Sequence, residues 1–305
     1  MQNTQSKSRL TATLAALLGN SIFGFSFMFS RMALESTSPY VMLMYRFCLA
    51  FLCINGVALW AKVKKKEGWL RFQIPWKQSA PLFLLGLIQP VLYFLCESWG
   101  ISMTNATVSG VIIALIPIAA LAGGALFLKE KPGMKRVLFS LLCILGVIVM
   151  TLQQSASGHV QALGIVLLVG AVLFGAMYNM FSRKISAAFS ALERTYVMML
   201  VGAAVFSLLA CMENGFDGGK LLLPLQNGRF MLAMGYLSLF SSILAFLCLN
   251  YAATILPVSR STAFCNLTTV LSVLAGVVFL GEPFTLLSGA AAVVIIIGVF
   301  GVQKT

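Results

Sequence analysis

The sequence has few charged residues. Only 10% of its 305 residues are Asp, Glu, Lys or Arg, whereas 60% are hydrophobic, and the mean hydropathy is +0.96. A soluble domain carries about 25% charged residues, so a soluble globular fold is excluded. The sequence also has a single aspartate, Asp217, and a single histidine, His159. An aspartate-rich metal centre is therefore excluded, and we expect no catalytic residues, no metal and no cofactor.

Long apolar runs fill most of the chain. A helix needs about 20 apolar residues to span a bilayer, and the first run is too long for the core of a signal peptide. The hydropathy pattern predicts ten spans, at 10–30, 39–61, 79–96, 106–128, 134–152, 160–182, 192–212, 230–252, 257–280 and 284–302. The expected fold class is an all-α polytopic membrane protein with ten transmembrane helices.

The basic residues lie mainly on one side of this topology. With a cytoplasmic amino terminus, 17 of the 21 Lys and Arg residues are cytoplasmic, Arg194 among them, while Arg31, Lys220 and Arg229 lie outside and Arg46 lies within a span. Lys and Arg are retained on the cytoplasmic side of membrane proteins. We therefore expect a multi-pass protein of the cell inner membrane with both termini in the cytoplasm. The net charge of +13 reflects this orientation, and no nucleic-acid partner is expected.

The two halves of the sequence repeat each other at a shift of 152 residues. Glu130 falls on Glu282, and Arg31 falls on Arg183. Five predicted spans separate the copies, and because five is odd the second copy enters the membrane from the opposite side. We predict two five-helix repeats of inverted topology, residues 1–152 and 153–305. Such repeats are typical of transporters whose central site opens alternately to the two sides of the membrane.

Polar residues interrupt the apolar runs at corresponding depths in both halves. A polar group without a partner in the bilayer costs a few kcal/mol, so these side chains should face protein or a water-filled cavity. Gln89, Tyr93 and Glu97 share one face of the third span, and the ninth span carries a second polar stripe. The candidate substrate-binding residues are Asn20, Ser21, Arg46, Gln89, Tyr93, Glu97, Ser241, Ser242, Asn266 and Thr269. Alternatively, the hydroxyl groups bond to their own backbone or join neighbouring helices.

Arg46 and Glu97 are the ionisable residues predicted inside the outer half of the bundle. They can pair with each other, which would offset much of the cost of burial. They can instead bind the carboxylate and the ammonium group of a zwitterion. A third reading makes Glu97 a proton carrier. The sequence leaves these alternatives open.

Several short motifs stand out in the first half. They are Phe23-Gly24 with Arg31 at the end of the first span, Tyr45-Arg46-Phe47, Ala106-Thr107-Val108-Ser109 leading to Ile116-Pro117, and Leu128-Lys129-Glu130. The second half carries equivalents of the last two, Val258-Ser259-Arg260-Ser261 and Leu280-Gly281-Glu282. Together they resemble the drug/metabolite transporter superfamily in its EamA-type ten-helix branch. The resemblance implies an inner-membrane carrier, with many relatives exporting amino acids or other metabolites through a cavity formed by spans one to four and six to nine. Spans five and ten would be peripheral.

The function expected is secondary transport. We predict a carrier that exports small neutral or zwitterionic metabolites, such as amino acids or their derivatives, by alternating access, as a monomer or homodimer in the lipid bilayer, with proton coupling left open. The first alternative is a transporter of drug-like or cationic compounds, although the first span lacks the acidic residue that small multidrug relatives use. The second alternative is a membrane scaffold or receptor subunit without a solvated interior.

Overall fold

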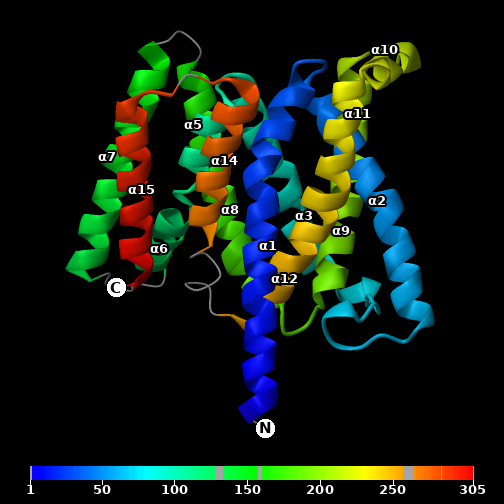
Figure 1. The fold of residues 1–305 in the computed structure, drawn as a ribbon. Helices are drawn as coiled ribbons and strands as arrows, with labels where there is room; N and C mark the ends of the chain where they lie inside the picture. The colour runs from blue at the N-terminus through cyan, green and yellow to red at the C-terminus, as the bar shows by residue number, and fades with distance from the viewer. Residues whose placement is uncertain (1, 128–132, 157–159, 257–263, 283, 305) are drawn as a thin grey trace.

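The computed structural model describes residues 2–127, 133–156, 160–256, 264–282 and 284–304. Within these ranges the chain is helical and contains no β-strand (Figure 1). Both ends of the chain lie at the same end of the helical bundle. We call this the terminal end and the opposite one the distal end.

The first half runs from α1 to α7. Its elements are α1 (Gln2–Leu34), α2 (Pro39–Val63), the short 3₁₀ helices η1 (Gly68–Leu70) and η2 (Trp76–Gln78), α3 (Ala80–Gly86), η3 (Leu87–Leu92), α4 (Tyr93–Ser102), α5 (Ala106–Ile113), α6 (Ile116–Phe127) and α7 (Met134–Ala156). The start of α2 is stabilised by neighbouring residues. The Ser38 hydroxyl accepts a hydrogen bond from the Val41 amide at 3.4 Å, and Pro39 occupies the first helical position. Both features favour a helix start.

The second half runs from α8 to α15. Its elements are α8 (Ala162–Ile185), α9 (Ala191–Glu213), α10 (Gly218–Leu222), η4 (Leu223–Gln226), α11 (Gly228–Gly235), η5 (Tyr236–Ala245), α12 (Phe246–Ile255), α14 (Cys265–Leu280) and α15 (Leu286–Lys304). A capping box opens α9, in which Ser190 and Glu193 each accept from the other's backbone amide. This arrangement satisfies two amides that the helix cannot pair.

The apolar helices agree with the predicted spans. In the described part of the chain, seven are long and apolar enough to cross a membrane: Arg9–Leu34, Pro39–Val63, Ala80–Ser102, Ala106–Gly123, Ala162–Ile185, Ala191–Glu213 and Gly228–Ile255. Three shorter apolar stretches are Val137–Met150, Leu267–Leu280 and Leu286–Gly301. The polytopic α-helical fold class is confirmed, while the count of ten spans stays a prediction.

The spans are interrupted at the depths that the polar residues indicated. Wide π-helical turns, η3 and η5, lie at Gln89-Pro90 and across Ser241-Ser242, and Gln89 has a non-helical backbone (φ −145°, ψ 118°). A further break separates α5 from α6, just before Pro117. In contrast, α14 continues without a break through Thr269. Breaks are therefore present at Gln89-Pro90, at Ser241-Ser242 and before Pro117, whereas Thr269, which falls on Pro117 at the 152 shift, lies within an unbroken helix.

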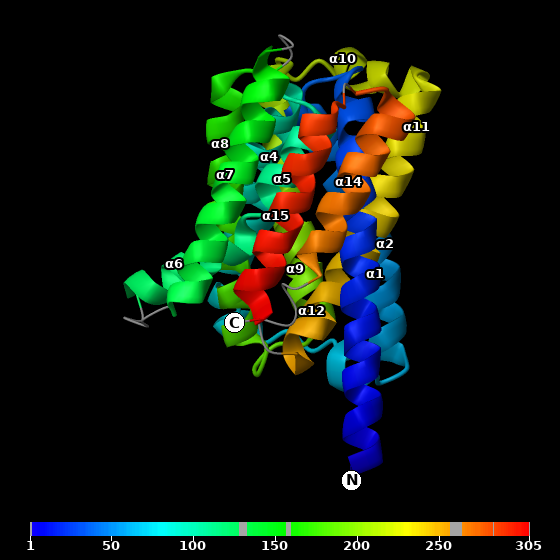
Figure 2. The same ribbon diagram turned by 60° about the vertical axis from the view of Figure 1, so that its left-hand side comes forward.

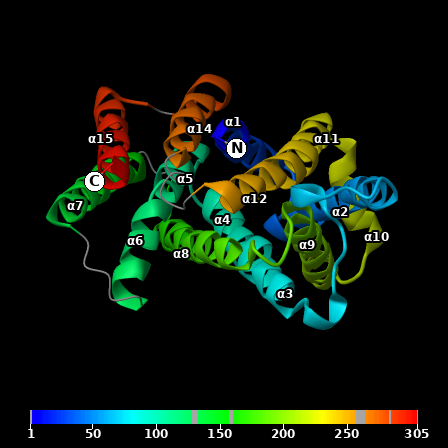
Figure 3. The same cartoon turned by 90° about the horizontal axis from the view of Figure 1, so that it is seen from below.

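One pair of helices lies at the edge of the bundle. Figure 2 shows α7 and α15 running side by side along the length of the bundle, and Figure 3 shows them together at one side of it. A Cβ atom on Gly146 would lie 2.7 Å from Ile295, and one on Gly298 would lie 2.5 Å from Cys143, so each glycine allows the other helix to approach closely. The contact is reciprocal, because these residues exchange places at a shift of 152.

A second contact recurs in both halves. Arg31 donates to the carbonyl oxygens of Ile101 and Ser102, both at 3.2 Å. Arg183, its counterpart at the 152 shift, donates to the carbonyl of Ala253, which is the counterpart of Ile101. Because α1 ends at the distal end and α8 at the terminal end (Figure 1), the two contacts lie at opposite ends, as an inverted duplication requires.

Candidate functional site: a central cavity

A cavity of about 80 Å³ lies between helices of both halves. It is lined from α1, η3, α4, α5, α6, α8, α12 and α14, and α7 and α15 take no part. The lining residues with polar side chains are Asn20, Ser26, Gln89, Tyr93, Glu97, Tyr178, Asn179, Ser182, Asn250 and Thr268. The phenylalanines of the lining are Phe23, Phe27, Phe94 and Phe246. A volume of this size holds several water molecules or a small solute group.

The polar stripe on the third span lines this cavity. Gln89, Tyr93 and Glu97 all contribute to the wall and are buried, as their spacing on one helical face predicted. The Tyr93 hydroxyl donates to Glu97 Oε1 at 2.9 Å. Tyr93 therefore orients the carboxylate by a hydrogen bond to a charged acceptor, which is stronger than one between neutral groups.

On α1, only one of the two predicted neighbours lines the cavity. Asn20 does so, with its side-chain amide donating to the Ala16 carbonyl at 2.8 Å. The Ser21 hydroxyl instead donates to the Leu17 carbonyl at 2.8 Å, and Ser21 is not part of the lining. Successive helix residues point about 100° apart, since a turn takes 3.6 residues, and Ser21 is on the side of α1 turned away from the cavity.

On α14, the residue that lines the cavity is Thr268, not Thr269. The Thr268 hydroxyl donates to the main-chain oxygen of Asn20 at 2.9 Å, whereas the Thr269 hydroxyl donates to the Gly110 carbonyl at 3.5 Å. The side chain of Asn266 lies outside the described residues. Among the described residues of this span, the position that faces the cavity is therefore one residue before the predicted one.

Arg46 lies behind the cavity wall rather than in it. It is fully buried, donates from Nε to Ser242 Oγ at 2.9 Å and from Nη2 to Ser241 Oγ at 2.8 Å. Its guanidinium carbon is 4.2 Å from the centroid of the Phe94 ring. Ser241 and Ser242, which we predicted in the cavity, are therefore outside its lining and join η5 to α2 through Arg46.

Arg46 and Glu97 do not form an ion pair. Across the described ranges, the one salt bridge joins Arg71 to Glu193 at 3.4 Å. Both side chains instead hydrogen-bond to neutral hydroxyl groups. Arg46 bonds to a serine hydroxyl of η5, and Glu97 bonds to the hydroxyl of Tyr93. The carboxylate of Glu97 is in the wall of the cavity and the guanidinium is not.

A second buried arginine, Arg194, was assigned by the sequence analysis to a cytoplasmic loop. The structure places it inside α9, fully buried, where it donates to Ser182 Oγ at 2.6 Å and to the Asn250 carbonyl at 2.8 Å. Asn250 Oδ1 also accepts from the Tyr178 hydroxyl at 3.0 Å. Arg194 thus holds two cavity-lining residues, Ser182 and Asn250, and Asn250 in turn holds Tyr178.

This network left a partial signal in the sequence. Asn179 and Asn250 carry side-chain amides within apolar runs. Like Gln89, such residues in a membrane span are expected to face protein or a water-filled cavity. Arg194 gave no such signal, because at the edge of a predicted span and close to Arg183 it is indistinguishable from a loop charge. Its burial depends on Ser182 and Asn250, which come from other helices.

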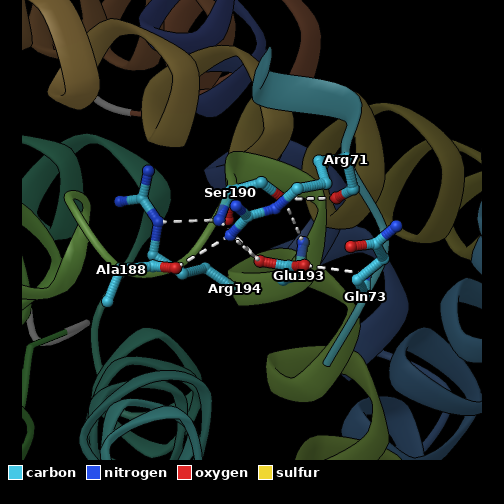
Figure 4. A network of polar contacts seen from close by, with 6 residues as sticks. All are labelled: Arg71, Gln73, Ala188, Ser190, Glu193 and Arg194. Carbon is cyan, nitrogen blue, oxygen red and sulfur yellow. Dashed lines mark hydrogen bonds and ion pairs between the residues drawn. The ribbon is translucent and has the colours of Figure 1, made fainter. Parts of the chain in front are cut away.

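Another polar cluster lies at the terminal end, outside the cavity (Figure 4). The carboxylate of Glu193 accepts from Arg71 Nη2 at 3.4 Å and from the Gln73 amide at 2.8 Å, and the Ser190 hydroxyl donates to the Arg71 carbonyl at 2.6 Å. Arg71 also donates to the Ala188 carbonyl at 2.9 Å. This cluster fastens the connection between α2 and α3 to the start of α9.

The chemistry of the cavity is that of a binding site. It offers one carboxylate, several amides and hydroxyls, and aromatic rings, and the described lining contains no Lys or Arg. In the part of the chain that is described, no three His, Cys, Asp or Glu side chains gather as a metal site would require. Such a lining suits a small organic solute with a positively charged group.

These features define a class: a polytopic helical membrane protein with a polar cavity enclosed by helices from both halves of the chain. The model of the EamA-like transporter family matches residues 10–152 and 162–303. The chain belongs to this family, whose members are membrane transporters and not enzymes.

The chain is similar to several transporters named as uncharacterized. It is 31% identical to the uncharacterized transporter YcxC of Bacillus subtilis, with 95% of this chain and 92% of that protein covered. A transporter of Archaeoglobus fulgidus is 23% identical over 92% of this chain and 95% of its own length. One crystal structure of another protein matches with a TM-score of 0.64 at 18% identity, covering 98% of both chains, which supports the fold alone.

Proposed function

We propose that the protein is a secondary transporter that moves small solutes bearing an ammonium group through its central cavity by alternating access. The observation that carries the proposal is the buried Glu97 carboxylate in a wall of aromatic rings, with no Lys or Arg among the described lining residues. An ammonium group gains from the carboxylate and from the faces of aromatic rings. Amino acids, their derivatives and related amines carry this group.

The location of Arg46 changes how a zwitterion would be held. In one of the alternatives that the sequence leaves open, Arg46 binds the carboxylate of an amino acid, but the guanidinium lies outside the cavity lining. The lining donors available to such a carboxylate are the side-chain amides of Gln89 and Asn179. Binding of the ammonium group is therefore the specific part of the proposal, and amino acids and amines both satisfy it.

Alternating access rests on the inverted repeat of residues 1–152 and 153–305. Both halves supply cavity residues, and the Arg31 and Arg183 contacts occur at opposite ends of the bundle. Asn179 and Ala253, towards the terminal end, are partly exposed, whereas Glu97 is buried. We propose that this conformation opens to the terminal end. With the protein in the inner membrane, the distribution of basic residues predicts that this end faces the cytoplasm.

The test compares three small solutes that share a phenyl ring and differ in their charged groups. Phenylalanine, phenethylamine and phenylacetate share a ring, and the third lacks the ammonium group. We expect the first two to raise the thermal unfolding midpoint of the purified protein and to be transported into proteoliposomes, and phenylacetate to do neither. Glu97→Gln should weaken binding of both amines roughly tenfold or more, because one charge-assisted hydrogen bond contributes about 1.5–3 kcal/mol.

The matched control is Glu35→Gln, which changes an exposed carboxylate outside the cavity and should leave binding unchanged. Binding of phenylacetate alone, or equal binding of the amines by wild type and Glu97→Gln, would contradict the proposal. A response to phenethylamine but not to phenylalanine would restrict the substrates to amines without a carboxylate.

A further inference from the structure

A second hollow lies at the terminal end of α2, away from the transport cavity. It encloses about 370 Å³ and is lined by Lys62, Lys65 and Lys66 on one side and by Gln73 and Trp76 on the other. The first group belongs to the last turn of α2 and the residues after it, and the second to the segment that leads to α3 (Figure 1). None of these residues lines the central cavity.

The backbone at the end of α2 brings the three lysines together. Lys65 has a left-handed conformation (φ 46°), its amide donates to the Lys62 carbonyl at 3.1 Å, and the Lys66 amide donates to the Ala61 carbonyl at 2.9 Å. This is a Schellman termination, in which glycine usually occupies the left-handed position. A lysine in this left-handed conformation is strained. Strained residues of this kind are found mainly at functional sites.

The opposite wall of the hollow is fixed to the bundle. The carboxylate of Glu193 accepts a hydrogen bond from the main-chain amide of Gln73 at 2.8 Å and forms a salt bridge with Arg71 at 3.4 Å (Figure 4). The ring of Phe72 also packs edge-on against Tyr196 of α9, with centroids 4.9 Å apart. The hollow is therefore a formed site between two anchored segments and not the outline of a loose connection.

The charge around the hollow is strongly positive. Lys62, Lys65 and Lys66 are exposed, as are Lys64 and Lys77 close by in sequence. The acidic residue within residues 61–79 is Glu67, and the carboxylate of Glu193 is occupied by Arg71 and backbone amides. Most of the lysine charge therefore has no acidic partner.

Exposed tryptophans lie in the same stretch of the chain, and one of them, Trp76, lines the hollow. Trp60, Trp69 and Trp76 are 47%, 40% and 56% exposed, and the Lys66 ammonium lies 4.9 Å from the ring centroid of Trp60. Tryptophan is enriched where membrane meets water. Since α2 is a spanning helix that ends at Val63, the hollow lies at the boundary between the apolar core of the membrane and the headgroups.

We propose that this hollow binds the phosphate headgroup of an anionic phospholipid in the adjacent membrane leaflet. The ammonium groups of Lys62, Lys65 and Lys66 contact the phosphate oxygens, and Trp76 and Trp60 lie beside the glycerol and the upper acyl chain. Lysines near a membrane surface attract anionic lipid. The site is independent of the solute carried by the transport cavity.

The test measures lipid binding to the full-length protein in neutral detergent. Phosphatidylglycerol should raise the thermal unfolding midpoint in a saturable manner, and phosphatidylcholine should not. The variant Lys62→Gln/Lys65→Gln/Lys66→Gln should bind phosphatidylglycerol roughly a hundredfold more weakly, since each surface lysine contributes roughly fivefold. Lys62→Gln/Lys66→Gln keeps the left-handed Lys65 and should lose roughly 25-fold, which tests the site without changing the turn.

The matched control Lys184→Gln/Lys220→Gln/Arg229→Gln removes three exposed cations elsewhere and should bind phosphatidylglycerol as wild type does. An equal loss in this control would overturn the site, because it would reveal a general charge effect. Unchanged binding in the double variant would also overturn it. A third arm adds inorganic phosphate without lipid: stabilisation equal to that by phosphatidylglycerol would mean a site for soluble phosphate and would overturn the lipid proposal.

Discussion

Two arginines show how a single residue obtains its role from its surroundings. Arg46 and Arg194 are both fully buried, and a buried charge is tolerated only with several hydrogen-bonding partners. Arg194 obtains them from Ser182 and Asn250 and so shapes the cavity wall. Arg46 obtains two behind the wall, from Ser241 and Ser242, while its Nη1 has no hydrogen-bond partner among the described residues. The first therefore supports the binding site directly, and the second joins two helices.

For Arg46 we expect a mainly structural effect of mutation. Arg46→Ala should fold but lose roughly 2 kcal/mol of stability, because two hydrogen bonds to a charged group are removed while a buried charge is also relieved. Ser242→Ala, which leaves Nε without its partner, should cost about 1–3 kcal/mol. Thermal unfolding and solute flux in proteoliposomes check both. Full stability of Arg46→Ala together with lost flux would instead indicate that Arg46 contacts the solute.

Access of water to Gln89 distinguishes a transporter from a scaffold with a dry interior. In a background without the native cysteines, we expect Gln89→Cys to react with a water-soluble thiol reagent and transported solute to protect it, because Gln89 lines the cavity. Ser242→Cys, buried outside the lining, should react much more slowly. Asn266→Cys, at a candidate binding residue of the ninth predicted span, should react as Gln89→Cys does. Equal, slow labelling at 89 and 242 would favour the scaffold.

At the scale of elements, the interruptions of the spans coincide with the cavity. Gln89 in η3 lines it, as do Ile113, Ala114 and Ile116 around the break between α5 and α6. Pro117 explains this break, since proline has no amide hydrogen to donate to the carbonyl four residues earlier, which belongs to Ile113, the last residue of α5. Breaks in spanning helices are tolerated where they line a cavity.

We expect Pro117→Ala to slow turnover more than it weakens binding. Alanine restores the missing donor and favours one continuous helix through residues 106–127, so that the hinge beside the cavity stiffens. Proteoliposome kinetics should give a several-fold lower kcat with a nearly unchanged KM. Leu121→Ala, which lies in α6 outside the cavity lining, serves as the control. Unchanged turnover with a raised KM would assign Pro117 to solute binding instead.

At the scale of the whole molecule, the inverted repeat predicts opposite locations for residues 152 positions apart. Met134 and Leu286 are such a pair, at the starts of α7 and α15, and are 73% and 94% exposed. A membrane-impermeant thiol reagent should label Leu286→Cys in intact cells and Met134→Cys only in inverted vesicles. Labelling of both from one side would refute the inverted arrangement and, with it, the proposed mechanism of alternating access.

The sequence predicted the elements better than their contacts. The polytopic helical fold class is confirmed, and seven predicted spans coincide with helices long enough to cross a membrane, because apolar length is a local property. Both termini lie at one end, and α7 and α15 are peripheral, as the family resemblance implied. Within the candidate site, Asn20, Gln89, Tyr93 and Glu97 line the cavity, while Ser21, Arg46, Ser241, Ser242 and Thr269 do not. Sequence spacing places a residue on a helical face but does not tell which neighbouring helix meets that face.

The amino-acid sequence alone determined that this is a membrane-embedded helical chain with polar interruptions in both halves, since apolar length and composition leave no soluble alternative. Only the tertiary structure decided that Glu97 lies in the cavity while Arg46 lies behind Phe94, and that Arg194 is an interior residue. The physical reason is that a buried charge is satisfied by groups from distant segments. Their convergence exists only once the helices have packed.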